Sequence, residues 1–124
     1  MVIFLRLLCY NLENYAYKQR RNSDRMKHLI IVKFKENVWN KEDAESRKML
    51  ADIREIFDRT KQIEGVHAVK IYENVTPRPN RHDLMIEMEM EPEALPVYDA
   101  SAPHREWKAK YGDFIQTKTI FDYE

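Results

Sequence analysis

The chain has 124 residues, enough for a single domain with one modest hydrophobic core. Its 21 Lys and Arg residues balance 21 Asp and Glu residues, a composition that gives no reason to expect nucleic acid or an anionic membrane as a partner. The single cysteine, Cys9, excludes a disulfide framework and fits a reducing, cytoplasmic location.

Residues 1–25 differ in character from the rest of the chain. They carry five basic and two acidic residues, and they begin with MVIFLRLLCY, an apolar stretch interrupted by Arg6. This stretch is far too short for a membrane span, and its basic residues follow it, whereas those of a secretory signal come first. We interpret residues 1–25 as a disordered extension, or as sequence translated ahead of a true start at Met26, with a weak membrane-surface anchor as the alternative. The folded domain is expected over residues 26–124.

Regular patterning begins with MKHLIIVKFK, residues 26–35, which is β-branched and apolar at its centre. This composition predicts a strand, with His28 on the same face as Ile30 and Val32. Because apolar side chains also occupy the other face, the strand is expected at the centre of a sheet that is covered from two sides.

Residues 40–65 predict a helix. Apolar side chains recur at helical spacing from Met49 to Ile63, and acidic residues follow Asn40 near the positive end of the helix dipole. Asn40 is expected to cap the first turn, and Gly65 is expected to end the helix in a left-handed conformation.

Two strands are predicted next, separated by a loop. Residues 66–73 read as a strand, and the two prolines in residues 74–81 forbid regular structure there. In residues 82–91 apolar side chains alternate strictly with glutamates, which is typical of a half-buried strand.

Residues 92–113 predict a helix in two pieces. Pro96 would distort a helix interior, whereas Pro103 suits the first turn of a second piece, which Gly112 ends. Residues 114–124, rich in threonine and aromatic residues, predict the last strand.

The order β-α-β-β-α-β predicts a ferredoxin-like α+β fold, in which right-handed crossovers place both helices on one face of a four-stranded antiparallel sheet. The other face would be bare in a monomer. Some of the apolar residues that alternate with the main core set are expected there: Leu29, Ile31, Ala68, Tyr72, Met85 and Ile120. Exposed apolar surface of this size favours a partner, and a second copy of the same sheet would give a homodimeric α/β barrel.

Tyr98 and His104 are candidate acid and base residues. An imidazole can accept a proton near neutral pH and a phenol can polarise a carbonyl oxygen, provided that both face one cavity. The alternative is that Tyr98 packs in the core while His104 lies at a helix start. His28 is either a pocket wall residue that binds a ligand carbonyl or a buried histidine with an ordinary hydrogen-bond partner.

No metal or phosphate site is predicted. The four histidines show no paired ligand spacing. The two glycines both stand at expected helix ends, so no phosphate-binding loop is formed. No cofactor is expected.

Residues 26–124 resemble the stress-responsive α/β-barrel (Dabb) family. The resemblance is carried by five segments in order: MKHLIIVKFK with its His28, EGVHAVKIYENVTPR, LMIEMEME, VYDASAPHREW and IFDYE. It implies a ferredoxin-like protomer and a homodimeric α+β barrel. Most members of this family have no assigned activity.

One plant branch of the family comprises polyketide cyclases, which close a linear poly-β-keto substrate by aldol chemistry with histidine and tyrosine and without a metal. Their motif reads Tyr, two residues, His-Pro-Ala-His, and here it corresponds to Tyr98 and then Ser101, Ala102, Pro103 and His104. The tyrosine and the second histidine are retained, and His28 matches the histidine of the first strand. Ser101 replaces the first histidine, and Leu84 stands where that branch has a histidine in its third strand, although His82 lies just before it.

These observations predict a homodimer that binds a small apolar or carbonyl-containing ligand in a barrel pocket. The alternative is a cofactor-free, cyclase-like lyase with His104 as general base, Tyr98 holding the carbonyl oxygen and His28 positioning the substrate. A weaker alternative is a monooxygenase or haem-binding barrel of the kind found among similar dimeric folds.

Overall fold

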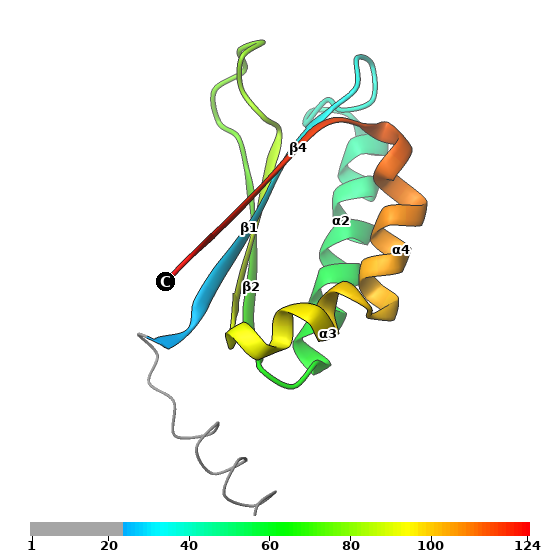
Figure 1. Ribbon diagram of the computed structural model, residues 1–124. Helices are drawn as coiled ribbons and strands as arrows, with labels where there is room; N and C mark the ends of the chain where they lie inside the picture. The colour runs from blue at the N-terminus through cyan, green and yellow to red at the C-terminus, as the bar shows by residue number, and fades with distance from the viewer. Residues whose placement is uncertain (1–23) are drawn as a thin grey trace, which may run out of the picture.

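The computed structural model describes residues 24–124, so the expected extension lies outside the described residues except for its last two. The predicted ferredoxin-like α+β fold is confirmed: two layers are present, a four-stranded antiparallel sheet and helices packed on one of its faces (Figure 1). The elements, in chain order, are β1 Met26–Phe34, α2 Ala44–Arg59, β2 Val66–Glu73, β3 Leu84–Met90, α3 Leu95–Asp99, α4 Ala102–Tyr111 and β4 Ile115–Tyr123. Short 3-10 turns occupy Thr60–Gln62, Pro92–Ala94 and Gly112–Phe114.

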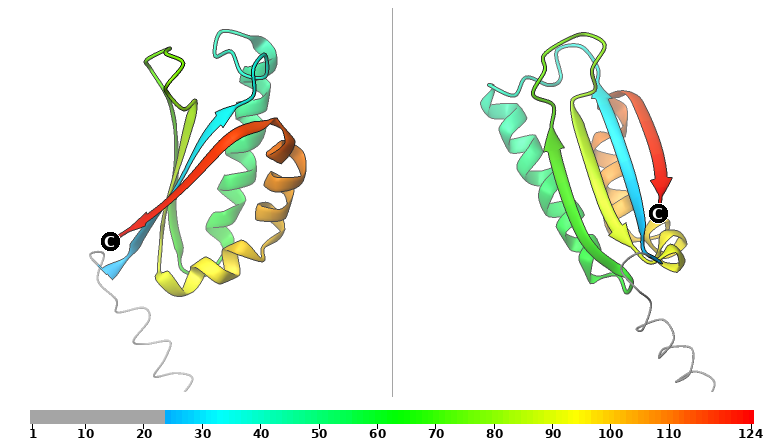
Figure 2. Two further views of the ribbon diagram at one scale, coloured as in Figure 1. Left: turned by 45° about the horizontal axis from the view of Figure 1, so that its top comes forward. Right: turned by 90° about the vertical axis from the view of Figure 1, so that its left-hand side faces the viewer.

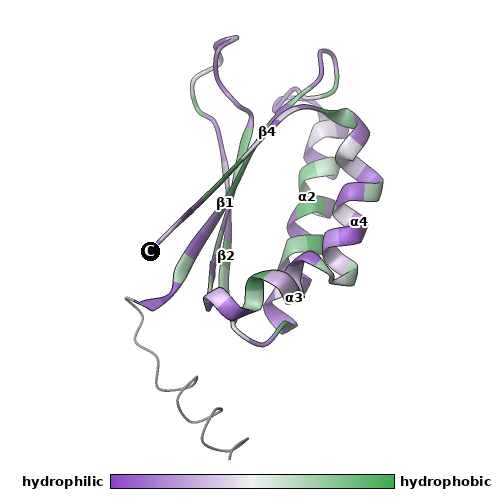
Figure 3. Ribbon diagram, in the orientation of Figure 1, coloured by the Kyte–Doolittle hydropathy of each residue, from purple (hydrophilic) through white to green (hydrophobic). Residues whose placement is uncertain are grey.

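Helix α2 forms where the periodicity placed it, but it starts later than expected. The residue that caps it is Asp43, whose carboxylate accepts a hydrogen bond from the Glu45 amide, and not Asn40, whose side chain accepts from Glu42 one turn earlier. Gly65 adopts the left-handed conformation predicted for it, with φ of 93°. It does not end α2, however, because the helix stops at Arg59 and the 3-10 turn Thr60–Gln62 follows. Hydrophobic residues recur along α2 (Figure 3), and its buried face includes Ile53, Ile56 and Phe57.

The second helical segment is interrupted as the prolines predicted. Pro96 lies in the first turn of the short α3, and Pro103 lies in the first turn of α4. Ser101 caps α4, because its hydroxyl accepts a hydrogen bond from the His104 amide. The turn between α3 and α4 therefore brings Tyr98 and His104 close together.

The sheet order is β2-β3-β1-β4, so β1 is central and β4 is an edge strand. Alternate residues of β1 and β3 face the helices and are buried, among them Ile30, Val32, Ile86 and Met88. Trp107 and Phe57 pack edge to face, with ring centroids 5.2 Å apart, and join α4 to α2 above this surface.

Within residues 24–124, no helix covers the other face of the sheet, which is turned to the viewer in the right-hand view of Figure 2. The strand registers place Leu29, Ile31, Ala68, Tyr72 and Met85 there, together with Phe121 and Tyr123. Lysines and glutamates are interspersed with them, including Lys27, which pairs with Glu87 and Glu89.

Ile120 lies on the opposite side from the one expected. It pairs with Ile30 across β1 and β4, so both residues face the helices. The expectation was wrong because the face of a strand residue depends on its register against the neighbouring strand, and residues 115–123 have no apolar alternation that would show it.

Across residues 24–124, none of the helices has both the length and the apolar character needed to cross a membrane.

Candidate functional site

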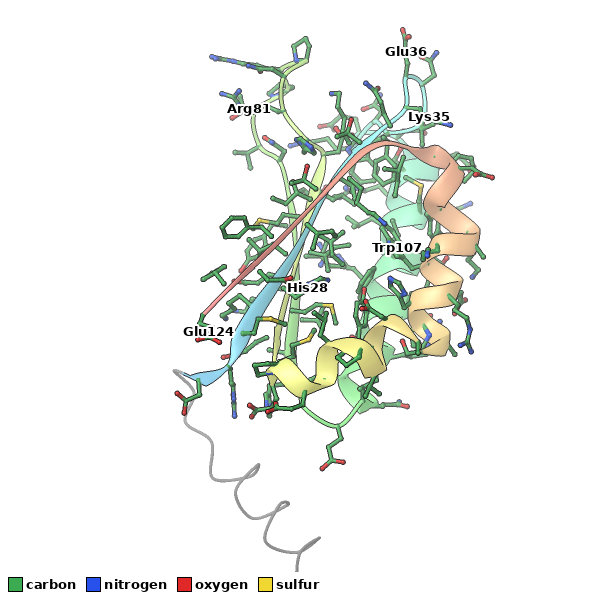
Figure 4. All side chains as sticks on the ribbon, in the orientation of Figure 1. His28, Lys35, Glu36, Arg81, Trp107 and Glu124 are labelled. Carbon is green, nitrogen blue, oxygen red and sulfur yellow. The ribbon has the colours of Figure 1, made fainter. Side chains whose placement is uncertain are left out.

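A pocket of about 330 Å³ lies between the β1–β4 part of the sheet and helices α3 and α4. Figure 4 shows His28 on β1 and Trp107 on α4 in the space between these two layers. The lining residues are His28, Ile30, Leu95, Tyr98, Asp99, His104, Trp107, Lys118, Ile120 and Asp122. The pocket thus brings together the three residues singled out from the sequence, each from a different element.

Tyr98 is the central residue of this group. It is fully buried, and its ring is close to both imidazoles, with ring centroids 5.7 Å from that of His28 and 4.8 Å from that of His104. Its hydroxyl is buried and has no hydrogen-bond partner among the described residues. Burial first, and the nearby charge of Asp99 second, raise the pKa of Tyr98 well above its ordinary value. The phenol therefore keeps its proton and is available to donate a hydrogen bond.

His104 has one ring nitrogen engaged and one available. Its Nδ1 lies 2.8 Å from the backbone carbonyl oxygen of Asp99. Because a carbonyl oxygen only accepts, Nδ1 must carry the proton, which leaves Nε2 with a free lone pair in the neutral ring. Burial lowers the pKa of His104 below its ordinary value of 6.5, and the bond to the Asp99 carbonyl partly opposes this shift. His104 is thus a neutral base at pH 7.

His28 is buried and paired with an acidic residue that the sequence reasoning missed. Its Nδ1 lies 2.5 Å from Oδ1 of Asp122, because the antiparallel register of β1 and β4 places these two residues opposite each other. With Nδ1–H as the donor to this carboxylate oxygen, Nε2 of His28 is also left available. The sequence did hold a signal: Asp122 is the one acidic residue in a strand otherwise made of threonine, aromatic and aliphatic residues with Gln116 and Lys118.

The other residues named in the family resemblance lie outside the pocket, and so does the fourth histidine, His67. Ser101, which stands in place of the first motif histidine, serves as the cap of α4. Leu84 is buried in the core of the sheet, and His82 lies in a separate hollow lined by the loops that follow β1 and β2. His67 pairs with the buried Glu91, 3.1 Å away.

Larger surface hollows over residues 24–124 lack this convergence of groups. One, of about 470 Å³, lies between α2, the loop after β1 and the C-terminal end of α4, and two others are larger still. The first of these two, of about 660 Å³, lies between the loop after β1 and the β2–β3 loop, where Arg81 is seen in Figure 4. The other, of about 710 Å³, runs beside the β2 edge of the sheet and α2. Over residues 24–124 there is also no group of three or more potential metal ligands.

Comparison with known proteins gives one family match. The model of the family described as "Stress responsive A/B Barrel Domain" (Dabb) matches residues 26–124. Among proteins with curated descriptions, no relative matches the chain.

Solved structures share the fold at low sequence identity. A dimeric protein of unknown function with a ferredoxin-like fold from Bacteroides fragilis has a TM-score of 0.67 at 14% identity, over 82% of this chain and 96% of its own. A Dabb family protein from Mesorhizobium loti has a TM-score of 0.64 at 17% identity, over 81% of this chain and 95% of its own. Hydroxynitrile lyase from Passiflora edulis has a TM-score of 0.62 at 12% identity, over 81% of this chain and 92% of its own.

Proposed function

This chain belongs to the stress-responsive A/B barrel domain family, and from that premise we propose that it is a homodimer that binds a small carbonyl-containing ligand in the pocket between the sheet and helices α3 and α4. The observation that carries the proposal is the hydroxyl of Tyr98, a residue that lines the pocket: this hydroxyl is buried and has no hydrogen-bond partner among residues 24–124. Buried polar groups nearly always have partners, and leaving one unpaired costs free energy. A ligand oxygen would supply the missing acceptor.

The chemistry around Tyr98 suits a carbonyl oxygen in particular. The raised pKa of Tyr98 keeps the phenol protonated, so its hydroxyl can donate a hydrogen bond to an oxygen atom of the ligand. Ile30, Leu95 and Ile120 give the pocket apolar walls. A pocket with apolar walls and a few convergent polar groups is the usual form of a small-molecule site.

A test of this proposal uses the neutral ketone octan-3-one and protein labelled with ¹⁵N in its histidines. The ring resonances of His28 and His104 are expected to shift on titration, because both rings line the pocket. Those of His67 and His82, which lie outside it, are expected to stay in place and serve as internal controls. Equal shifts of all four histidines, or no shift at millimolar ketone, would contradict the proposal.

Replacing Tyr98 with phenylalanine is expected to separate binding from stability. The variant loses the donor to the ligand, so affinity for octan-3-one should fall about two- to tenfold, the effect of one hydrogen bond. The free energy of unfolding should not fall, because the hydroxyl removed has no hydrogen-bond partner in the described part of the chain, residues 24–124. Isothermal titration and urea unfolding measure the two quantities. A variant that loses stability but binds the ketone normally would assign the hydroxyl to the fold.

The homodimer is proposed through the helix-free face of the sheet. Phe121, Tyr72 and Tyr123 are each at least 43% exposed on this face in the single chain, and burial of aromatic side chains favours association. Structures of the same fold from Bacteroides fragilis and Thermobifida fusca are described as dimeric. Sedimentation at micromolar concentration is expected to give a mass twice that of the protomer. The Phe121→Glu substitution should shift the measured mass toward that of the protomer. A protomer mass for the unaltered chain would exclude this assembly.

A second candidate is a cofactor-free lyase or cyclase acting at the same pocket, and the free Nε2 of neutral His104 favours it. In this reaction Nε2 would take the proton from the carbon next to a ligand carbonyl, while the Tyr98 hydroxyl donates to the enolate oxygen that forms. His28, oriented by Asp122, would position the ligand. The fold itself is compatible with lyase chemistry, since a structural neighbour is described as a hydroxynitrile lyase.

A further inference from the structure

Lys118 is the basic residue of the pocket wall, and the proposed function gives it no role. It lies on β4 opposite Val32, on the side of the sheet that faces the helices. Side chains on one face of a strand recur at every second residue, so Lys118, Ile120 and Asp122 form a row along the pocket. At about 3.3 Å per residue, the two charged ends of this row are about 13 Å apart at their Cα atoms.

The two ends of the row differ in how their charges are engaged. The carboxylate of Asp122 is paired with the Nδ1 atom of His28. Within residues 24–124, the side-chain ammonium of Lys118 forms no ion pair or hydrogen bond, in contrast to those of Lys27, Lys61 and Lys110. Over the described residues, the pocket therefore presents at one end a lysine ammonium with no direct ion-pair partner, and its acid–base groups, with the acidic residue Asp99, also line it.

We infer that the ligand carries a carboxylate in addition to its carbonyl group, and that Lys118 binds this carboxylate. The inference rests on the proposed function, because it describes the second end of the same ligand. With the carboxylate at Lys118, the carbon chain would run past Ile120 and place a carbonyl group near Tyr98. The ligand class is then an oxo acid with an apolar chain. An ammonium–carboxylate contact is a charge-assisted hydrogen bond, stronger than the bonds that a neutral ester can form there.

The position of Lys118 relative to the base supports this arrangement. Its positive charge is one of the causes that lower the pKa of His104, along with burial and the charge of Lys108, while Asp99 acts in the opposite direction. A carboxylate placed on Lys118 would cancel that contribution. Binding of an oxo acid is therefore expected to raise the pKa of His104 relative to its value with the ester.

The test compares 4-, 5- and 6-oxooctanoate with their neutral methyl esters, so that charge changes while chain length is scanned. Dissociation constants are measured from the histidine ring resonances. At least one acid is expected to bind the unaltered protein about tenfold more tightly than its ester, the usual effect of a charge-assisted bond. Lys118→Met should remove this preference and leave ester affinity within about twofold, and Lys118→Arg should retain it.

Lys108→Met is the matched control. Lys108 carries the same charge and also lowers the pKa of His104, but it lies on α4 and does not line the pocket. The acid preference should therefore survive this substitution. If Lys108→Met reduced the preference for the acid as much as Lys118→Met, that preference would reflect the overall electrostatic potential of the protein. The inference would then be overturned.

The remaining outcomes separate the inference from the proposed function. Equal affinity of each acid and its ester for the unaltered protein, with shifts at His28 and His104, would overturn the role of Lys118 and leave the ketone site in place. That result would instead assign Lys118 the role of preventing another strand from pairing with the exposed edge of β4, a common use of lysine on edge strands. If neither acid nor ester reached these histidines, the proposed function would fail and the inference with it.

Discussion

In the proposed lyase or cyclase reaction, replacement of His104 with alanine is expected to lower proton exchange at the carbon next to a bound carbonyl by about a hundredfold or more, the usual contribution of a general base. The reason is that Nε2 of His104 is the basic nitrogen freed by the contact of Nδ1 with the Asp99 carbonyl. The measurement is loss of the α-proton signals of octan-3-one in deuterated water, which needs no knowledge of the natural substrate.

The pH dependence of the same exchange gives an independent check. A base must be unprotonated to act, so the rate should rise with pH through the pKa of His104 and then level off. Because burial lowers that pKa, the plateau should be reached at a lower pH than for an ordinary histidine of pKa 6.5. His82→Ala, in the separate loop hollow, should leave rate and pH profile unchanged. Unaltered exchange in the folded His104→Ala protein would exclude His104 as the base.

Replacement of Trp107 with alanine is expected to produce the largest loss of stability, about 3–5 kcal/mol. Trp107 is 2% exposed and contacts Phe57 of α2 edge to face, with Tyr111 one turn further along α4. Its removal would leave a cavity between the two helices that rigid neighbours cannot fill. The free energy of unfolding in urea measures the effect.

The neighbouring residue provides the control for this variant. Lys108 is exposed on the outer side of the same helix, and Lys108→Ala should change the free energy of unfolding by no more than about 0.5 kcal/mol. A loss below about 1 kcal/mol for Trp107→Ala would mean that the helix layer closes around the gap, contrary to the close packing of protein interiors. Trp107 also lines the pocket, so the variant should bind octan-3-one more weakly even where it remains folded.

Local pattern was enough to identify the elements and the family. The 3.6-residue recurrence in α2 and the strict alternation in β3 each come from burial of one face, which depends on neighbours along the chain. The division between α3 and α4 followed from the fixed backbone of Pro96 and Pro103. The cap of α2 was misplaced because Asn40 and Asp43 are both suitable residues, and only the backbone path decides between them.

The site was predictable in part for the same reason. Tyr98 and His104 are six residues apart across a turn that the sequence encodes, so their proximity is local, and the resemblance to the family added His28. The sequence could not pair His28 with Asp122, because 94 residues separate them and their contact depends on the register of two strands. Nor could it show that the Tyr98 hydroxyl lacks a partner, which depends on every group packed around it.

The amino-acid sequence by itself thus determined the order of helices and strands, the ferredoxin-like fold and three of the pocket residues. The tertiary structure alone decided that Ile120 and Lys118 face the helices and that Asp122 holds His28. The physical reason is the two-residue repeat of a β-strand: a shift of one position in the pairing of β4 with β1 would turn all three side chains to the other face. That register is set by long-range pairing, and residues 115–123 carry no apolar alternation from which it can be read.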